Sequence, residues 1–223
     1  MDRKLGNALL AEFFGTFVLV FVGAAVVATL TIPNSNGSVV IPALGHGLIV
    51  LGLVYAFASV SGGHFNPAVT VALLVAGKIA LAKSVYYWIA QFAGAIVGAL
   101  VLSFLISSAP GSPYGQAIGA MTEANLTYAA VIEAIGTFIF VTVIYQVAVN
   151  GKAGKLATGV IGLTLSALIL AIGAYSGASL NPARTLGPAL AAGNLSYVPA
   201  YFIGIFAGGI LAGLFNGYLY KPE

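Results

Sequence analysis

Six long apolar stretches limit what this chain can fold into. A helix needs about 20 apolar residues to cross the roughly 30 Å hydrocarbon core of a membrane. Only 6% of the 223 residues are charged and 60% are hydrophobic, whereas about a quarter of the residues in a soluble domain are charged. The sequence therefore predicts an all-α integral membrane protein in contact with the lipid bilayer, whose spans lie near residues 5–29, 40–60, 83–107, 128–149, 156–174 and 197–219.

Two shorter apolar segments, 61–78 and 175–193, each contain the sequence Asn-Pro-Ala. Asn is a favoured N-cap and Pro a favoured first helical residue, so each motif predicts a helix start. About eleven residues follow each Asn, enough for roughly 16 Å of helix, or half a bilayer core. Non-helical backbone at that depth is tolerated only where protein buries it or where it lines a water-filled cavity. The sequence thus predicts two re-entrant half-helices beside a pore, starting at Asn66, Pro67, Ala68 and at Asn181, Pro182, Ala183.

The chain also repeats itself. Glu12-Phe-Phe-Gly-Thr-Phe matches Glu133-Ala-Ile-Gly-Thr-Phe at an offset of 121 residues, and the two Asn-Pro-Ala motifs are offset by 115 (181 − 66). Each repeat, about 1–107 and 128–223, would hold three spans and one half-helix within a single channel domain. Because three is odd, the two repeats are inverted, and their half-helices enter from opposite faces and meet near the midplane.

The basic residues predict the orientation. Seven of the eight would lie on one side of the membrane, which the positive-inside rule makes cytoplasmic, together with both termini. This pattern explains the net charge of +3 without a nucleic-acid partner. The exception is Arg184, three residues after Asn181, and an intramembrane Arg is a functional candidate. The seven are Arg3, Lys4, Lys78, Lys83, Lys152, Lys155 and Lys221.

The residues expected where the half-helices meet predict a passive pore. The Asn66 and Asn181 amides would donate to the oxygen of a water molecule, whose hydrogens then point away along the channel and cannot pass a proton. Two positive helix ends and Arg184 would repel cations. No nucleophile–base set and no metal-ligand spacing occurs, and Cys is absent. We therefore expect neither an enzyme, nor a cofactor, nor a metal site.

With two Asn-Pro-Ala motifs, two Glu-x-x-Gly-Thr-Phe spans and six spans in all, the sequence resembles aquaporins of the major intrinsic protein family over essentially its whole length. The resemblance implies a right-handed bundle of six transmembrane helices and two re-entrant half-helices, assembled as a homotetramer. The compact length resembles prokaryotic members, which implies a plasma or inner membrane.

The resemblance also implies a selectivity filter formed by His46, Ile169, Ala178 and Arg184. Water-selective members have an aromatic residue where His46 stands and a His where Ile169 stands. The set is similar to that of plant vacuolar-membrane aquaporins, which pass ammonia or urea besides water. We therefore expect water, ammonia and possible further small neutral solutes as permeants.

Two alternatives stay open. A glycerol or small-polyol facilitator would typically carry Asp at the position of Thr185 and would lack the aromatic pair Tyr201-Phe202. A secondary transporter shares inverted repeats and broken helices. It would need a coupling-ion site, for which only Glu12, Glu133 and Arg184 are available.

Several polar and aromatic residues receive structural interpretations. Glu12 and Glu133 are expected to accept hydrogen bonds from the backbone of the motif loops, because an uncompensated carboxylate is costly inside a membrane. His64 either lines the cytoplasmic vestibule or anchors its loop. Tyr86, Tyr87 and Trp88 are interpreted as interfacial anchors.

Overall fold

The computed structural model describes residues 3–33, 37–109, 112 and 114–219. It is all-helical in this part of the chain, and six of its helices are long and apolar enough to cross a membrane. The six predicted spans are thereby confirmed. They are α1 (Arg3–Ala28), extended by η1 (Thr29–Thr31); α2 (Val40–Ser61); α4 (Leu81–Leu105); α6 (Leu126–Ile144), extended by a π-helical turn, η2 (Tyr145–Val149); α7 (Ala157–Ser176), preceded by η3 (Gly154–Leu156); and α9 (Val198–Leu219).

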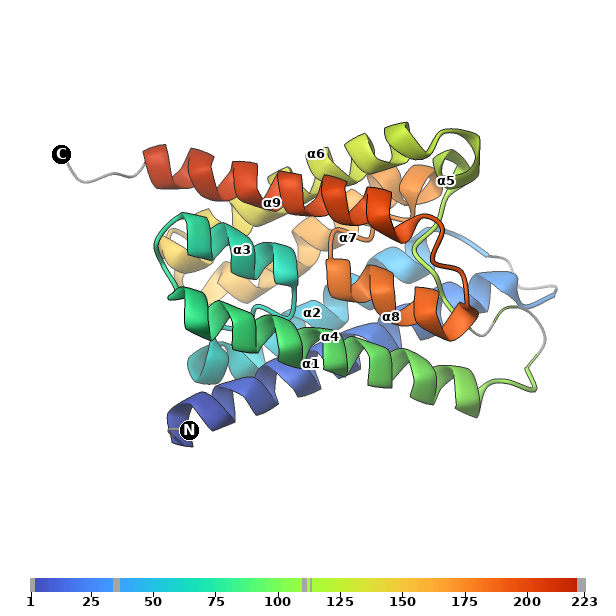
Figure 1. Ribbon diagram of the computed structural model, residues 1–223, viewed down its shortest axis with the longest axis horizontal. Coiled ribbons are helices and arrows are strands. Elements are labelled where there is room, and N and C mark those ends of the chain that lie inside the picture. Colours follow the sequence, from blue (N-terminus) through green and yellow to red (C-terminus); the bar gives the residue numbers. More distant parts are fainter. Residues whose placement is uncertain (1–2, 34–36, 110–111, 113, 220–223) are drawn as a thin grey trace.

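Three pairs of long helices form the bundle. Helix α1 packs on α4, α6 packs on α9, and α2 packs on α7. Figure 1 shows the half-helices α3 (Pro67–Val75) and α8 (Pro182–Ala192) lying one after the other between α9 and α4. A short helix, α5 (Ala120–Ala124), precedes α6. Each half-helix contacts long helices of both repeats.

Glycines allow the closest helix contacts. A Cβ at Gly94 or Gly98 of α4 would overlap the α1 backbone, and one at Gly204 or Gly208 of α9 would overlap the α6 backbone. Small residues spaced four apart let membrane helices approach closely. Gly94 and Gly208 correspond across the repeat (208 − 94 is 114), and so do the residues that they meet, Phe13 and Ala134 (134 − 13 is 121). Each half of the bundle therefore has one close glycine contact at an equivalent place.

The half-helices start and end by the same local rules. Asn66 and Asn181 cap them with their side-chain oxygens, and Pro67 and Pro182 follow as first residues. Each ends at a glycine with positive φ, Gly77 or Gly193, where the backbone closes a Schellman motif. Helix α3 has nine residues and α8 eleven, so α3 is shorter than expected because Gly77 stops it early. Together they cover about 30 Å, one bilayer core.

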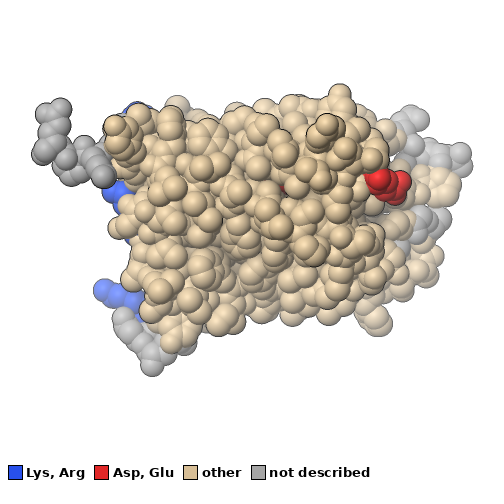
Figure 2. All heavy atoms as spheres, turned by 45° about the horizontal axis from the view of Figure 1, so that its top comes forward, with Lys and Arg blue, Asp and Glu red and all other residues tan. Residues whose placement is uncertain are grey.

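The charged residues divide the molecule into two ends. Arg3 and Lys4 begin α1, Lys78 and Lys83 flank the start of α4, and Lys152 and Lys155 lie between α6 and α7. We call this end, where Figure 2 shows the Lys and Arg side chains, the basic end. Figure 1 shows α5, which carries the exposed Glu123, at the opposite end, which we call the far end. Lys221 lies outside the described residues.

Candidate functional site

The two Asn-Pro-Ala turns are joined by reciprocal hydrogen bonds. Asn66 Nδ2 donates to the Leu180 carbonyl at 2.8 Å, and Asn181 Nδ2 donates to the Phe65 carbonyl at 2.9 Å. Their Oδ1 atoms accept from backbone N–H groups of their own half-helices. One amide hydrogen of each Asn is thus committed to the opposite turn. The second amide hydrogen of each Asn is left to donate to a permeant, as expected from the sequence.

The carbonyls that accept these bonds belong to strained residues. Phe65 has φ 48° and Leu180 has φ 52°, a left-handed conformation that costs a residue other than glycine roughly 1–2 kcal/mol. Their side chains occupy space left by Gly15 of α1 and Gly136 of α6, where a Cβ would overlap them. The Gly of each Glu-x-x-Gly-Thr-Phe motif therefore makes room for the strained turn.

The Glu of the same motif holds the first turn. Glu12 is fully buried and accepts from Ser61 Oγ at 2.7 Å and from the backbone N–H of His64 at 2.9 Å. Its second oxygen accepts from the Phe65 N–H at 2.7 Å and from Gln91 Nε2 at 2.8 Å. Four donors therefore surround a carboxylate that would otherwise be costly to bury.

The second turn is held in the same way with one donor fewer. Glu133 is fully buried and accepts from Ser176 Oγ at 2.7 Å, the Ser179 N–H at 2.9 Å and the Leu180 N–H at 2.7 Å. Ile205 stands at the repeat position of Gln91 (205 − 91 is 114) and offers no donor. Both glutamates hold their loops through side-chain and backbone contacts.

His64 contacts both its own loop and the cavity. Its Nδ1 lies 3.0 Å from Thr70 Oγ1, and its ring meets Tyr87 edge-on with centroids 5.1 Å apart. On the basic side of Asn66, His64 also lines the largest cavity described below, which we call the main cavity. The two interpretations of His64 are thus compatible, because the anchored ring forms part of the wall.

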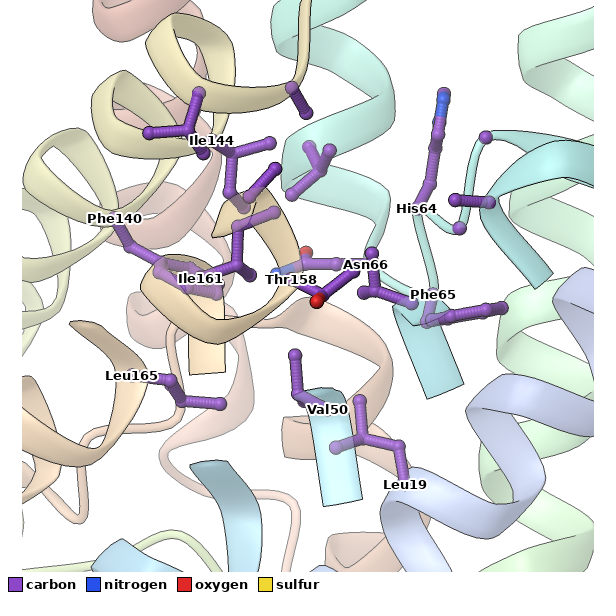
Figure 3. Close-up of a pocket in the computed structure, with 18 of the residues that line it drawn as sticks. Leu19, Val50, His64, Phe65, Asn66, Phe140, Ile144, Thr158, Ile161 and Leu165 are labelled. Carbon is purple, nitrogen blue, oxygen red and sulfur yellow. The ribbon is translucent and has the colours of Figure 1, made fainter. Parts of the chain in front are cut away.

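A cavity of about 750 Å³ runs from the α6–α7 connection at the basic end to His46 and Arg184. Figure 3 shows Asn66 pointing into it among apolar side chains that include Leu19, Val50 and Ile161, while Phe65 points the other way. Asn181 lines the same cavity. The wall thus offers few polar groups, and the two Asn amides stand where the half-helices meet.

His46 and Arg184 close this cavity at its far side. His46 Nδ1 donates to the Pro42 carbonyl at 2.8 Å, which leaves Nε2 to accept from Arg184 Nε at 3.4 Å. A Cβ at Gly23 would overlap the His46 ring. Arg184 is only 3% exposed, and its Nη1 has no hydrogen-bond partner among the described residues. The Arg184 Nη1 group is therefore buried beside His46 without a protein acceptor among the described residues.

The other two predicted filter residues lie on either side of this contact. Ala178 lines the main cavity, next to the motif turn. Ile169 lines a second cavity of about 310 Å³ on the far side, which His46 also borders. The structure thus places His46 between the two cavities, with Arg184 beside it.

Several supporting residues were missed from the sequence. Tyr87 is fully buried and its hydroxyl donates to the Ser61 carbonyl at 2.6 Å, and Trp88 Nε1 donates to the Pro67 carbonyl at 3.3 Å. The interpretation of Tyr87 as an interfacial anchor is therefore wrong, whereas Tyr86 is 48% exposed and Trp88 is only partly buried, so that this interpretation stays a prediction for both. Tyr201 donates to the Ser176 carbonyl in the same way at 2.6 Å. The repeat offset, which pairs Tyr87 with Tyr201, could have revealed both.

Comparison with known proteins identifies the architecture. The family model described as major intrinsic protein matches residues 2–216. The probable aquaporin TIP3-2 of Arabidopsis thaliana is 39% identical over 97% of this chain and 85% of its own length. The probable aquaporin TIP2-2 of Oryza sativa subsp. japonica is 40% identical over 96% and 87%. The crystal structure of the aquaglyceroporin from Plasmodium falciparum superposes with a TM-score of 0.84 at 28% identity, covering 98% of both chains.

The relatives are named aquaporins, which are passive channels and not enzymes. The family match, residues 2–216, includes both Asn-Pro-Ala turns, the first five spans and all but the last three residues of the sixth. The chain is therefore an integral membrane protein that belongs to the aquaporins of the major intrinsic protein family.

Proposed function

We propose that the protein is a passive channel that conducts water and ammonia and excludes protons and ions. In this proposal the whole chain forms one channel domain of two inverted repeats, about 1–107 and 128–223. The observation that carries the proposal is the paired arrangement of Asn66 and Asn181, each bonded to the opposite turn inside an otherwise apolar cavity.

The pairing supports water conduction without proton conduction. Each Asn keeps one amide hydrogen to donate to a water oxygen, and both half-helices present their positive ends there. A water held by both amides turns its hydrogens toward its neighbours on either side and accepts none from them. The chain of hydrogen bonds that a proton would follow is thereby interrupted.

The far constriction supports ammonia as a second permeant. Arg184 and His46 offer hydrogen-bonding nitrogens, while Ile169 presents an aliphatic surface where a His would add a donor and fill space. A small neutral molecule that both donates and accepts hydrogen bonds meets suitable partners here. An ammonium ion faces the charge of Arg184 and two positive helix ends.

A glycerol facilitator remains the second candidate, because one solved structure with the same fold is named an aquaglyceroporin. Against it, Thr185 follows Arg184 and its hydroxyl is within hydrogen-bonding distance of Ser179 Oγ at 2.6 Å, and Phe202 stacks on Phe92. An ion-coupled transporter is less suitable. Its candidate carboxylates, Glu12 and Glu133, are fully buried, and both oxygens of each already accept hydrogen bonds from protein donors.

We further propose that the basic end faces the cytoplasm, because positively charged loops are retained there. The proposed assembly is a homotetramer in the plasma or inner membrane, with one pore per protomer. Light-scattering mass measurement in detergent would test the assembly.

A flux panel on purified protein in liposomes tests the proposed permeants. We expect fast water efflux with low activation energy and ammonia-driven internal alkalinisation, both well above protein-free liposomes, and slower entry of urea and glycerol. Ammonia flux no faster than through bare lipid would remove ammonia from the proposal. Saturable uptake that depends on an ion gradient would favour the transporter.

A further inference from the structure

The last turn of α6 departs from α-helical geometry beside the pore entrance. Residues Tyr145–Val149 form a π-helical turn, and the Asn150 N–H donates to the Tyr145 carbonyl, five residues back, at 2.9 Å. Such turns are rare and often occur at functional sites. This one carries Val147, Ala148 and Val149, which line the main cavity at the basic end.

Two amide side chains hold this turn to α9. Gln146 Nε2 donates to Asn216 Oδ1 at 2.6 Å, and Asn216 Nδ2 donates to the Ala212 carbonyl at 2.8 Å and to Thr142 Oγ1 at 3.3 Å. Asn216 is fully buried within an apolar helix. Burying an amide there is costly unless it is hydrogen-bonded. We call the Gln146–Asn216 contact the amide pin.

The other repeat lacks such a pin. The offsets between the repeats place Ala25 at the position of Gln146 (146 − 25 is 121) and Leu102 at that of Asn216 (216 − 102 is 114). Both residues line an apolar cavity of about 200 Å³ at the far end of the bundle. The same helix contact therefore forms with an Ala and a Leu, and packing alone does not require the two amides.

We propose that Gln146 and Asn216 are positioning residues that keep the basic-end entrance of the pore open, an inference that rests on the proposed channel function. The pin holds the π-helical turn against α9, so that the turn forms the wall of the mouth without closing it. Without the pin, the exposed side chains of Val149 and Leu156 would fold into the apolar cavity, because burying apolar surface lowers the free energy. A constriction lined by such side chains excludes water.

The absence of Cys allows this to be tested with single introduced thiols. Ala148→Cys reports on the mouth, and Ala82→Cys, on an exposed position of α4 at the same end and outside the cavity, reports on the reagent and the fold. In purified protein, Asn216→Leu should slow maleimide modification of the Ala148→Cys thiol about tenfold, as expected for the loss of buried hydrogen bonds. The Ala82→Cys thiol should react at the parental rate.

Two further variants complete the test: Gln146→Ala removes the same contact from its other partner, and Leu102→Ala is the control for general loosening of the bundle. Gln146→Ala removes the pin from its less buried side and should give the same slowing, so the test does not depend on the folding of Asn216→Leu. Leu102→Ala loosens the corresponding contact at the far end and should leave the Ala148→Cys rate unchanged. Water permeability in liposomes should fall several-fold in both pin variants and stay parental in the control.

Parental thiol rates and parental water permeability in both pin variants would overturn the inference. Equal slowing in Leu102→Ala would overturn it as well, because the effect would then follow from general loosening. A parent protein without water flux would instead refute the proposed channel function, and the thiol rates would still decide whether the pin holds the turn.

Discussion

The two ends of the pore are built from corresponding positions and differ in chemistry. An offset of 115 residues places Ile161, Val54, Gly63 and Val69 opposite His46, Ile169, Ala178 and Arg184 (161 − 46, 169 − 54, 178 − 63 and 184 − 69). All four counterparts line the wide main cavity toward the basic end. The far end carries an imidazole and a guanidinium in contact, whereas the basic end carries aliphatic side chains and a glycine at the same places.

The frame around the two turns is conserved between the repeats even though the pore surface is not. Ser61 and Ser176 both donate to a buried glutamate, and Tyr87 and Tyr201 both donate to a serine carbonyl. Apart from the two Asn amides, which both repeats present to the cavity, the shared groups named here hold the backbone of the turns. The difference shows that this scaffold accommodates either an apolar or a charged pore end, and it supports our proposal that selectivity is placed at the far end.

The largest effect, a loss of solute selectivity, is expected when the pore surface at the far end is made like that at the basic end. Arg184→Val copies Val69 and removes a charged hydrogen-bond donor from the constriction. A bond to a charged group contributes about 1.5–3 kcal/mol, so relative permeability to urea or glycerol should rise roughly 10–100-fold. Proton leak should rise as well. Liposome flux assays measure solute permeability and proton leak. Val69→Ala is the control and should leave selectivity at the parental value. An unchanged urea-to-water permeability ratio in Arg184→Val would contradict the assignment of Arg184 to the selectivity filter.

The next largest effect is a loss of stability when the buried glutamates that hold the two turns are replaced. Glu12→Gln replaces one carboxylate oxygen by a donor, and each Glu12 oxygen serves two donors. The Oε2 atom of Glu133 serves only the Leu180 N–H, so Glu133→Gln can place its amide nitrogen there at a smaller loss. We expect a cost of roughly 1–3 kcal/mol for Glu12→Gln and less for Glu133→Gln. Thermal unfolding in detergent at a matched scan rate checks the order, and the reverse order would count against the two-donor argument.

A smaller effect on stability should follow from removing Gln91, a supporting residue that the second repeat does not share. Gln91→Leu deletes the bonds to Glu12 and to Thr70, which are 2.8 and 3.0 Å long. It should lower stability by about 1 kcal/mol, whereas Ile205→Leu at the corresponding position conserves volume and should change little. The same unfolding assay compares them. Equal losses would mean that Gln91 contributes only by packing.

Much of the fold could be predicted from the sequence because its signals are local. An Asn-Pro pair specifies a helix start, a run of about 20 apolar residues specifies a span, and a repeated Glu-x-x-Gly marks two equivalent loop contacts. The structure places Glu12 and Glu133 at those loops and brings His46 to Arg184.

What escaped prediction depends on how each helix is rotated. The spans are apolar on all sides, so no amphipathic face shows which side chains point inward. Tyr87 therefore looked like an interfacial anchor although it is buried against the first turn. The π-helical turn at Tyr145–Val149 is bonded to Asn216, 70 residues away from Gln146, and has no local sequence signal.

The central claim is that selectivity resides at the far end alone, and one pair of variants tests it most directly. Ile169→His adds a donor and bulk beside His46, whereas Val54→His makes the same change at the corresponding position of the basic end. Water and ammonia permeabilities are measured in liposomes for the parent and both variants. We predict a lower ammonia-to-water ratio for Ile169→His and a parental ratio for Val54→His. Equal shifts in both variants, or a shift only in Val54→His, would contradict the claim.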